Sequence, residues 1–270
     1  MRCHYQATSK YGDPAHEIDL FQRNAIVTGF ALEPVVERFP EVDSLVRVEG
    51  TIIAADKTVQ LWVRTWEAID VLSPDHCIFD LALPQWIVDR AIVDRACALW
   101  ASLPVEDRRF VNAVFLDPQV LRGFLSAPGS CTHHHAHDGG CVEHSVQTAE
   151  MAESMAAQSP HLDRDLLVTL ALVHDSGKAL EYEKTRSGRW RMSSCGRRVG
   201  HKVSGIRLAS LALSHCPEME DKRKESLIHL LSCSFAPSWV GLRTPDMDEA
   251  RVFSAIDRLS AEAGRHPRMG

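Results

Sequence analysis

The sequence predicts a mainly helical protein in which a small β unit precedes one larger, all-helical domain. Segments rich in Val, Ile, Thr and Trp are concentrated before residue 70. After them, a proline-containing connector leads into segments whose apolar residues recur at helical spacing toward the C-terminal end. No internal repeat interrupts this division, so we expect two structural parts of unequal size.

The N-terminal part is expected to contain a flexible arm and a β-rich domain. Residues 1–22 are polar and lack clear periodicity, which predicts the arm. Strand-like segments follow at 24–32, 44–54 and 58–69, and the last two are joined by a link short enough for a hairpin. This pattern predicts a β-rich domain over 23–82. An OB-like barrel stays open as its architecture, although three strands are fewer than the five that such a barrel needs.

The remaining chain, residues 84–270, is predicted to form helices and loops only. Its first helix, 84–103, places Ile87, Ile92 and Leu99 at helical spacing, with Asp–Arg pairs on the other side. Further helices are expected at 106–115, 117–126, 140–157, 164–176, 200–214, 222–234 and 247–263. The helical domain therefore makes up most of the chain.

Charge and composition narrow the classes of partner and location. The 270 residues carry a formal charge of −6 at pH 7 and a pI of about 6.1, so a nucleic-acid substrate would need a local basic patch. No apolar run is long enough for a transmembrane helix, and the N-terminus lacks the apolar stretch of a secretory signal. The 8 cysteines form no CxxC pair. We therefore expect a cytoplasmic protein with free thiols and no membrane partner.

One pair of polar residues ends an otherwise apolar helix. His174 and Asp175 follow the run LLVTLALV and precede Gly177, which favours a helix stop. An imidazole and a carboxylate at the end of a buried helix must be paired with each other or bound to something else. A divalent ion satisfies both groups, and this mixture of nitrogen and oxygen suits Mn, Fe, Co, Ni or Zn. The alternative is a hydrogen bond between the two side chains.

Other helices offer further ligands of the same kind. His144 lies near the apolar side of a helix opened by Gly139–Gly140, in the histidine-rich stretch CTHHHAHDGGCVEHS. His201 opens a later helix, and Asp257 stands beside an apolar residue in the last one. The sequence therefore predicts a metal site assembled from separate helices.

These motifs, in this order, resemble the HD metal-dependent phosphohydrolase superfamily. The similarity is closer to the YhaM-type 3′–5′ exoribonucleases, which carry a double histidine, a glycine pair and the first ligand histidine with the spacing of HHAHDGGCVEH at 134–144. The related HD module of MobH-type conjugative relaxases is similar over the same stretch, roughly 115–263. The resemblance implies an all-helical HD-type domain that uses a divalent ion, such as Mn, Fe, Co, Ni, Mg or Zn.

The resemblance also implies roles for individual residues. One ion would be held by four ligands: His144, His174, Asp175 and Asp257. Asp175 could bridge to a second ion, with His201 among its ligands. Lys178 would act with Asp175 in catalysis by facing the substrate phosphate, unless it is a surface residue after the helix stop.

The chain departs from this branch in one stretch. A Ser-His-His run usually completes the second metal site, whereas 229–239 reads HLLSCSFAPSW. Ser234 and Phe235, or Cys233 after a shift of one residue, replace the histidines. We therefore expect one ion, a second only if His201 suffices to hold it, and catalysis that could be weakened.

A basic segment suggests the substrate. Residues 184–202 contain seven Lys and Arg side chains around Trp190 and no acid, a combination that suits a phosphodiester backbone and a stacked base. A solvated hairpin is the alternative. The predicted substrate-binding residues are His134, His135, Arg189, Trp190, Arg191, Arg197 and Arg198. His133 and His137 are expected to face solvent.

The sequence thus predicts a metal-dependent phosphodiesterase that hydrolyses single-stranded RNA or DNA, as a 3′–5′ exonuclease. Two alternatives remain. One is a phosphohydrolase of small nucleotides, and the other is a weakly active, relaxase-like accessory module of a mobile element that binds nucleic acid. The sequence does not indicate the oligomeric state.

Overall fold

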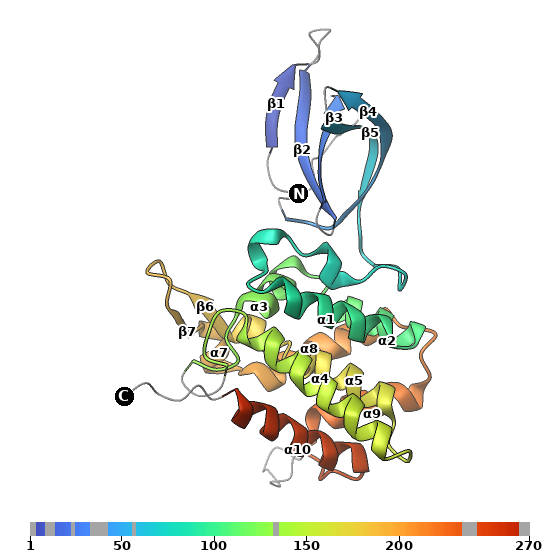
Figure 1. Ribbon diagram of the computed structural model, residues 1–270, viewed down its shortest axis with the longest axis vertical. Coiled ribbons are helices and arrows are strands. Elements are labelled where there is room, and N and C mark those ends of the chain that lie inside the picture. Colours follow the sequence, from blue (N-terminus) through green and yellow to red (C-terminus); the bar gives the residue numbers. More distant parts are fainter. Residues whose placement is uncertain are drawn as a thin grey trace. The chain divides into compact units, whose positions relative to one another are not determined.

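The chain divides into two units, each with its own elements (Figure 1). The computed structural model describes residues 4–8, 14–22, 25–32, 43–55, 58–131, 135–233 and 242–264. Unit 1 comprises Met1–Val71 and Asp80–Pro84, and unit 2 comprises Leu72–Phe79 and Gln85–Gly270. A helical domain preceded by a small β unit was predicted, and this fold class is confirmed.

Unit 1 contains a five-stranded sheet of order β1-β2-β3-β5-β4. Its strands are β1 (His4–Thr8), β2 (Pro14–Gln22), β3 (Ala25–Leu32), β4 (Val46–Ala55) and β5 (Thr58–Ala68). β3 and β5 pair in parallel, whereas the other neighbours are antiparallel. The three strands predicted from the sequence are present, with β4 and β5 forming the expected hairpin. The five strands and their non-sequential order support the OB-like architecture, which stays a prediction.

The predicted flexible arm over residues 1–22 is wrong, because this segment contributes β1 and β2. β2 pairs with β3 along eight positions, so the sheet provides hydrogen-bond partners for the backbone N–H and C=O groups of this polar segment. Within β2, Ile18 packs with Ala31 and Val63 in the core of the sheet. Ile18 and Leu20 pack on the inner side of β2, and this short alternation is too weak a period-2 signal to reveal a strand.

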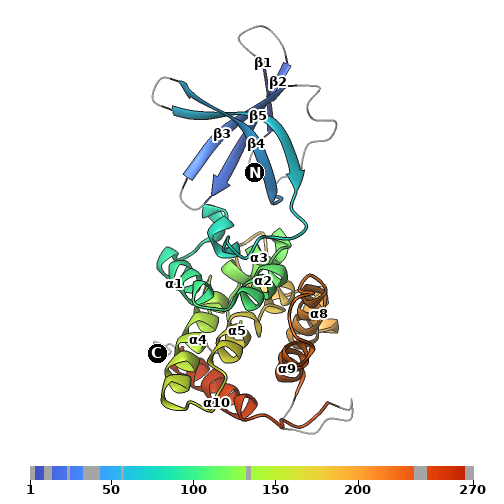
Figure 2. The ribbon, with the colours of Figure 1, turned by 90° about the vertical axis from the view of Figure 1, so that its right-hand side faces the viewer.

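Unit 2 is built from ten helices among the described residues (Figure 2). They are α1 (Arg90–Ala101), α2 (Val105–Val114), α3 (Pro118–Ser126), α4 (Gly140–Gln158), α5 (Arg164–Val173), α6 (Lys178–Glu181), α7 (Ser194–Arg198), α8 (His201–Ser214), α9 (Asp221–Ser232) and α10 (Asp248–Ala263). The first predicted helix begins later than residue 84, because the Asp89 carboxylate caps α1 by accepting from the backbone N–H of Ala91 at 2.9 Å.

A short hairpin interrupts the helices, against the prediction of helices and loops alone. Strands β6 (Tyr182–Lys184) and β7 (Trp190–Met192) pair with Tyr182 opposite Met192. The hairpin lies within the basic segment, whose charged side chains gave no clear strand pattern in the sequence.

Helix α5 lies at the centre of unit 2, in contact with α4, α2, α9 and α10 (Figure 2). Every residue from Leu166 to Val173 is buried, which explains why its apolar run has no polar face. Nearby, the rings of Phe79, Phe115 and Phe124 pack with centroids 4.5–6.2 Å apart. The C-terminal end of α5 is therefore held by a packed core, and this end carries His174.

The expected absence of a transmembrane helix and the expected free thiols can be compared with the described residues. No helix among them is both long and apolar enough to span a membrane. Seven of the cysteines are free thiols in the part of the chain that the structure describes: Cys77, Cys97, Cys131, Cys141, Cys195, Cys216 and Cys233.

Candidate metal centre

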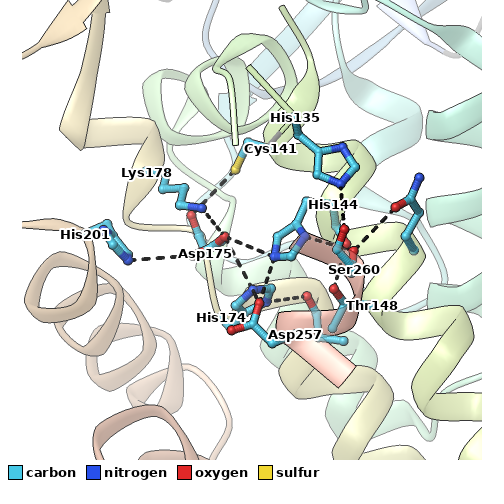
Figure 3. A network of polar contacts seen from close by, with 12 residues as sticks. His135, Cys141, His144, Thr148, His174, Asp175, Lys178, His201, Asp257 and Ser260 are labelled. Carbon is cyan, nitrogen blue, oxygen red and sulfur yellow. Dashed lines mark hydrogen bonds and ion pairs between the residues drawn. The ribbon is translucent and has the colours of Figure 1, made fainter. Parts of the chain in front are cut away.

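Three predicted ligands from three helices meet at one point (Figure 3). His144 comes from the first turns of α4, His174 ends α5, and Asp257 comes from α10. One potential ligand atom from each of these residues lies within 4.8 Å of the other two. The side chain of His144 is 1 % exposed and that of Asp257 is 40 % exposed, so the cluster is closed on one side and open on the other.

The hydrogen bonds of the two imidazoles determine which ring nitrogen is available. His174 donates from Nδ1 to the Ala171 carbonyl at 2.9 Å, so its Nε2 carries a lone pair. This Nε2 is buried and accepts no hydrogen bond from any described residue. His144 donates from Nδ1 to Ser260 Oγ at 3.0 Å, and that hydroxyl donates onward to Gln147. In its neutral form, each ring therefore turns an Nε2 lone pair toward the same space.

Asp175 completes this group. Its Oδ2 lies 3.4 Å from His174 Nε2 and 3.7 Å from His144 Nε2. Although burial opposes ionisation, Lys178 and His174 hold the pKa of Asp175 well below its usual range. Asp257 Oδ1 lies 2.9 Å from His144 Nε2, and His144 and His174 lower the pKa of this carboxyl against the effect of burial. Two ionised oxygens thus face two nitrogen lone pairs.

This donor set fits a divalent metal ion. Two atoms that each lie about 2.1 Å from an ion are about 3 Å apart when adjacent and about 4.2 Å apart when opposite. The separations between the ligand atoms given above, 2.9–3.7 Å, fall within this range. An ion would also give the buried Nε2 of His174 a partner. Imidazole and carboxylate together suit Mn, Fe, Co, Ni or Zn, and the identity of the metal is not determined by this geometry.

His201 lies on the other side of Asp175, where a second ion was expected. Its Nε2 is 3.9 Å from Asp175 Oδ1, while its Nδ1 is 2.5 Å from the carboxylate of Glu181. A carboxylate behind a histidine fixes its tautomer and orients it toward a metal. The sequence reasoning missed Glu181, which lies one turn after Lys178 and is buried. His201 and Asp175 are the only predicted donors of the second site among the described residues, because Ser234 and Phe235 lie outside them and Cys233 carries a thiol.

Gly177 sets the distance between His201 and Asp175. A Cβ atom on Gly177 would lie 2.0 Å from the backbone oxygen of His201 and 2.6 Å from the backbone nitrogen of Gly205. The HD turn therefore packs directly against the first turn of α8, and only glycine permits this approach.

Replacing Gly177 with alanine should displace the start of α8 and move His201 away from Asp175. We expect a loss of about 1–3 kcal/mol in the free energy of unfolding, typical of overpacking. The matched control is Gly205→Ala, because a Cβ there meets its nearest atom at 3.6 Å. Chemical denaturation of both variants checks this, and equal stabilities would contradict the tight approach.

Lys178 is buried beside the metal cluster rather than on the surface. Its Nζ lies 2.5 Å from Asp175 Oδ2, and although burial opposes protonation, Asp175 raises the pKa of the ammonium group. The predicted surface alternative for Lys178 is thereby excluded, since the residue is 6 % exposed. Lys178 lines the same cleft as the metal cluster.

The cluster lies in a cleft of about 590 Å³. Besides the metal-cluster residues, basic and hydroxyl side chains line the cleft, including Lys202, Arg258 and Tyr182. Burial and the neighbouring Glu181 raise the pKa of Tyr182 to about 12, so its phenol keeps its proton at neutral pH. Arg258 was missed by the sequence reasoning, although it follows Asp257 directly. Cys233 also lines the cleft.

The predicted substrate-binding arginines lie outside the lining of this cleft. Arg189 and Arg198 are exposed, while Arg191 pairs with Glu183 and Arg197 donates to the Met192 carbonyl. Of the basic segment, 184–202, His201 and Lys202 at its C-terminal end line the cleft.

Trp190 is occupied by other contacts. Its indole N–H donates to Asp138 at 2.6 Å, and Lys184 lies over its ring at 5.3 Å while pairing with the same carboxylate. Trp190 therefore anchors the hairpin to the loop before α4. A stacking role toward a base stays a prediction.

Of the double histidine, His134 and His135, the structure describes only His135. His134 lies outside the described residues. His135 is 2 % exposed and does not line the cleft, and its contact with substrate stays a prediction. The His135 carbonyl accepts a hydrogen bond from the backbone N–H of Gly129, and the His135 N–H donates to the Gly264 carbonyl. The His135 backbone also passes close to Gly140, where a Cβ atom would lie 2.0 Å from the His135 oxygen. Gly139, with φ of 78°, takes the left-handed conformation that opens α4.

Comparisons with known proteins agree with this geometry. Residues 141–262 match the HD domain family. The 3′–5′ exoribonuclease YhaM of Bacillus licheniformis is 32 % identical over 142 residues, which are 52 % of this chain and 44 % of that protein. YhaM of Shouchella clausii is 30 % identical over 152 residues, or 55 % and 46 % of the two chains. YhaM of Bacillus subtilis is 30 % identical over 142 residues, or 52 % and 44 %.

The matched stretch is therefore less than half the length of these relatives. No solved structure matches the chain significantly. The matched family segment contains all five metal-ligand candidates: His144, His174, Asp175, His201 and Asp257. Residues 141–262 thus match the HD domain family, and about half of the chain is similar to the YhaM exoribonucleases.

Proposed function

We propose that the protein is a metal-dependent phosphodiesterase that hydrolyses single-stranded nucleic acid from the 3′ end, with RNA as its first substrate. The observation that carries this proposal is the convergence of His144, His174 and Asp257 with Asp175 in a cleft that also holds basic side chains. The similarity to proteins named 3′–5′ exoribonucleases supports RNA and the polarity.

The charges in the cleft suit a phosphodiester. A divalent ion bound at the cluster would polarise the phosphoryl group and lower the pKa of an attacking water. Arg258 and Lys202 lie in the cleft lining and supply positive charge for neighbouring phosphates. Tyr182 keeps a phenolic proton that it can donate to a phosphate oxygen.

Lys178 has two roles in this proposal. Its ammonium group keeps Asp175 ionised as a ligand, because the two groups lie 2.5 Å apart. It also brings a fixed positive charge to the scissile phosphate, where negative charge increases in the transition state. Because Lys178 is buried, this charge acts with little screening by solvent.

A single assay tests the proposed function. Purified protein is incubated with 5′-labelled single-stranded RNA and Mn²⁺, and the products are separated by length. We expect progressive shortening from the 3′ end and its loss when EDTA removes the metal. Internal cuts alone would contradict the exonuclease. Binding without cleavage under Mn²⁺, Mg²⁺, Co²⁺ and Zn²⁺ would favour the accessory module instead.

A phosphohydrolase of small nucleotides is the second candidate. The cleft volume of about 590 Å³ lies within the range of about 300–1,000 Å³ that is usual for small-molecule pockets. Release of inorganic phosphate or a nucleoside from mononucleotides, at a higher kcat/KM than for RNA, would identify this function.

Charge reversal separates the cleft from the exposed hairpin as the place where RNA binds. We expect Arg258→Glu and Lys202→Glu each to weaken RNA binding and to reduce the salt slope by about 1, as for the loss of one phosphate contact. Arg207→Glu is the control for Lys202→Glu, because Arg207 is exposed on the same helix and does not line the cleft. Fluorescence anisotropy at several salt concentrations measures this.

The same experiment also tests the exposed arginines outside the cleft, Arg189 in the hairpin and Arg198 in α7. If Arg189→Glu and Arg198→Glu weaken binding while Arg258→Glu does not, the cleft is not the main phosphate-binding surface. If both groups weaken it, the strand extends from the cleft over the hairpin.

A further inference from the structure

A second cluster of potential ligands lies before and within the first turns of α4. His135, His137 and Glu143 each place one ligand atom within 4.8 Å of the other two. The Oε2 atom of Glu143 lies 3.3 Å from His135 Nδ1 and 2.9 Å from His137 Nε2. These residues are separate from the four ligands of the HD cluster, and His135 and His137 precede the segment that matches the HD family.

The outer nitrogen of each ring faces a backbone carbonyl. His135 Nε2 lies 3.4 Å from the Ser260 oxygen, and His137 Nδ1 lies 3.1 Å from the Asp138 oxygen. A backbone carbonyl and the Glu143 carboxylate both only accept hydrogen bonds, so each neutral ring has one proton for two acceptors. When the outer nitrogens keep their protons toward the carbonyls, the inner nitrogens carry lone pairs.

Both lone pairs point at one carboxylate oxygen, which is also an acceptor. Three acceptors at 2.9–3.3 Å repel one another unless a cation lies among them. One proton could serve only one of the two rings, whereas one divalent ion takes both lone pairs and the carboxylate. Backbone carbonyls behind the outer nitrogens are also the usual support for histidines that bind metals.

We propose that His135, His137 and Glu143 form a second metal site, distinct from the HD centre. Two imidazoles and one carboxylate select a borderline transition ion such as Zn²⁺ or Co²⁺ over Mg²⁺ or Ca²⁺.

An ion could reach this site from solvent. The side chains of His137 and Glu143 are 40 % and 25 % exposed, and both line a cleft of about 540 Å³ together with Asp89 and Asp138. His135, whose side chain is 3 % exposed, is the buried member of the cluster and does not line this cleft. The remaining coordination positions would face this cleft.

The proposed ion would act on the arrangement of the HD centre. It would hold His135 against the carbonyl of Ser260, whose hydroxyl accepts the hydrogen bond from the metal ligand His144. The ring centroids of His135 and His144 lie 5.4 Å apart. The second ion would thus be structural, joining the segment before α4 to α10.

The test counts ions in a protein whose HD centre has been disabled. Untagged full-length chain carrying His174→Ala and Asp257→Asn is stripped with a chelator and titrated with Co²⁺ and then Zn²⁺. We expect one ion to bind per chain, with the visible ligand-field absorption of Co²⁺ and a rise in Tm. Because no hydrolysis is measured, the result does not depend on the proposed function.

Further substitutions in this background locate the ion. His137→Ala or Glu143→Gln should weaken binding by at least about 100-fold, since even the outer-shell partners of metal ligands are worth about 10- to 100-fold. Both residues are partly exposed, so the fold should persist, and circular dichroism checks this. His161→Ala, an exposed histidine outside both clusters, should bind the ion unchanged.

Two outcomes would overturn the proposal. The first is that the protein with the disabled HD centre binds no Co²⁺ or Zn²⁺, which would leave a protonated ion pair between His137 and Glu143. The second is that binding is lost in a variant with His133→Ala and His134→Ala but kept in His137→Ala, which would place the ion elsewhere in the histidine-rich stretch.

Discussion

Replacing His174 with alanine should lower the rate of RNA hydrolysis by at least about 1000-fold, equivalent to about 4 kcal/mol in the activation barrier. The substitution removes the one buried Nε2 that has no hydrogen-bond partner among the described residues and that faces both Asp175 and Asp257. Without it, the ion loses a ligand from the most rigid helix of the unit. Single-turnover cleavage of labelled RNA measures the change, and the metal content of the same sample should fall with it.

Two controls make this result specific. Asp257→Asn keeps the shape of a side chain that is 40 % exposed and removes its charge, so it should lose activity without unfolding. His161→Ala removes an exposed histidine and should retain wild-type activity. Wild-type cleavage by His174→Ala, in a preparation free of contaminating nuclease, would show that this cluster is not the active site.

The largest effect on stability is expected from Arg223 on α9. Its guanidinium pairs with Asp107 of α2 and lies 2.6 Å from Asp163, which caps α5. The Asp107 side chain is 1 % exposed, and burial raises the pKa of its carboxyl even with Arg223 beside it. Arg223→Met would leave this buried charge uncompensated, at a cost of about 3 kcal/mol or more. Urea denaturation at pH 7 measures it.

The pH dependence identifies the cause. A carboxyl whose pKa is raised in the folded state destabilises the protein as the pH rises through that pKa, because the folded state must give up a proton that it binds more tightly. The deficit of Arg223→Met relative to wild type should therefore be largest at neutral pH and shrink under mildly acidic conditions. A deficit that is independent of pH would point to lost packing instead. Arg109→Met, which removes a pair with the exposed Glu218, should cost far less.

The candidate ligands of the HD centre could be proposed from the sequence because several of them are marked by their local sequence. His174 and Asp175 are polar residues at the end of a buried apolar run, and Gly139–Gly140 announce the start of the helix that carries His144. Patterns of this kind can be read from the sequence, because burial and helix termini restrict which residue types occur at neighbouring positions. The residues that support the ligands, such as Ser260 and Glu181, carry no comparable mark.

The errors also have physical reasons. β2 was missed because a strand with one well-buried apolar residue depends on its partner β3 for stability, and that pairing is invisible in a single segment. His135 was predicted at the substrate from its place in the double histidine, and the structure buries its side chain beside Glu143 and Ser260. The arginines of 189–198 were expected near the metal because they are close to it in the chain, yet the β6–β7 hairpin directs the segment elsewhere.

The sequence by itself determined the helical class of unit 2, the chemical identity of the metal ligands and the order in which they occur, because periodicity and residue type are local properties. Only the tertiary structure decided which side chains meet. His144 and Asp257 are 113 residues apart in the chain and 2.9 Å apart in space. It also decided which nitrogen of each histidine faces the cluster, because that depends on the carbonyl or hydroxyl that packing places behind the ring. In the histidine-rich stretch, packing therefore places His144 in the cluster of the HD centre, and His135 and His137 in a second cluster with Glu143.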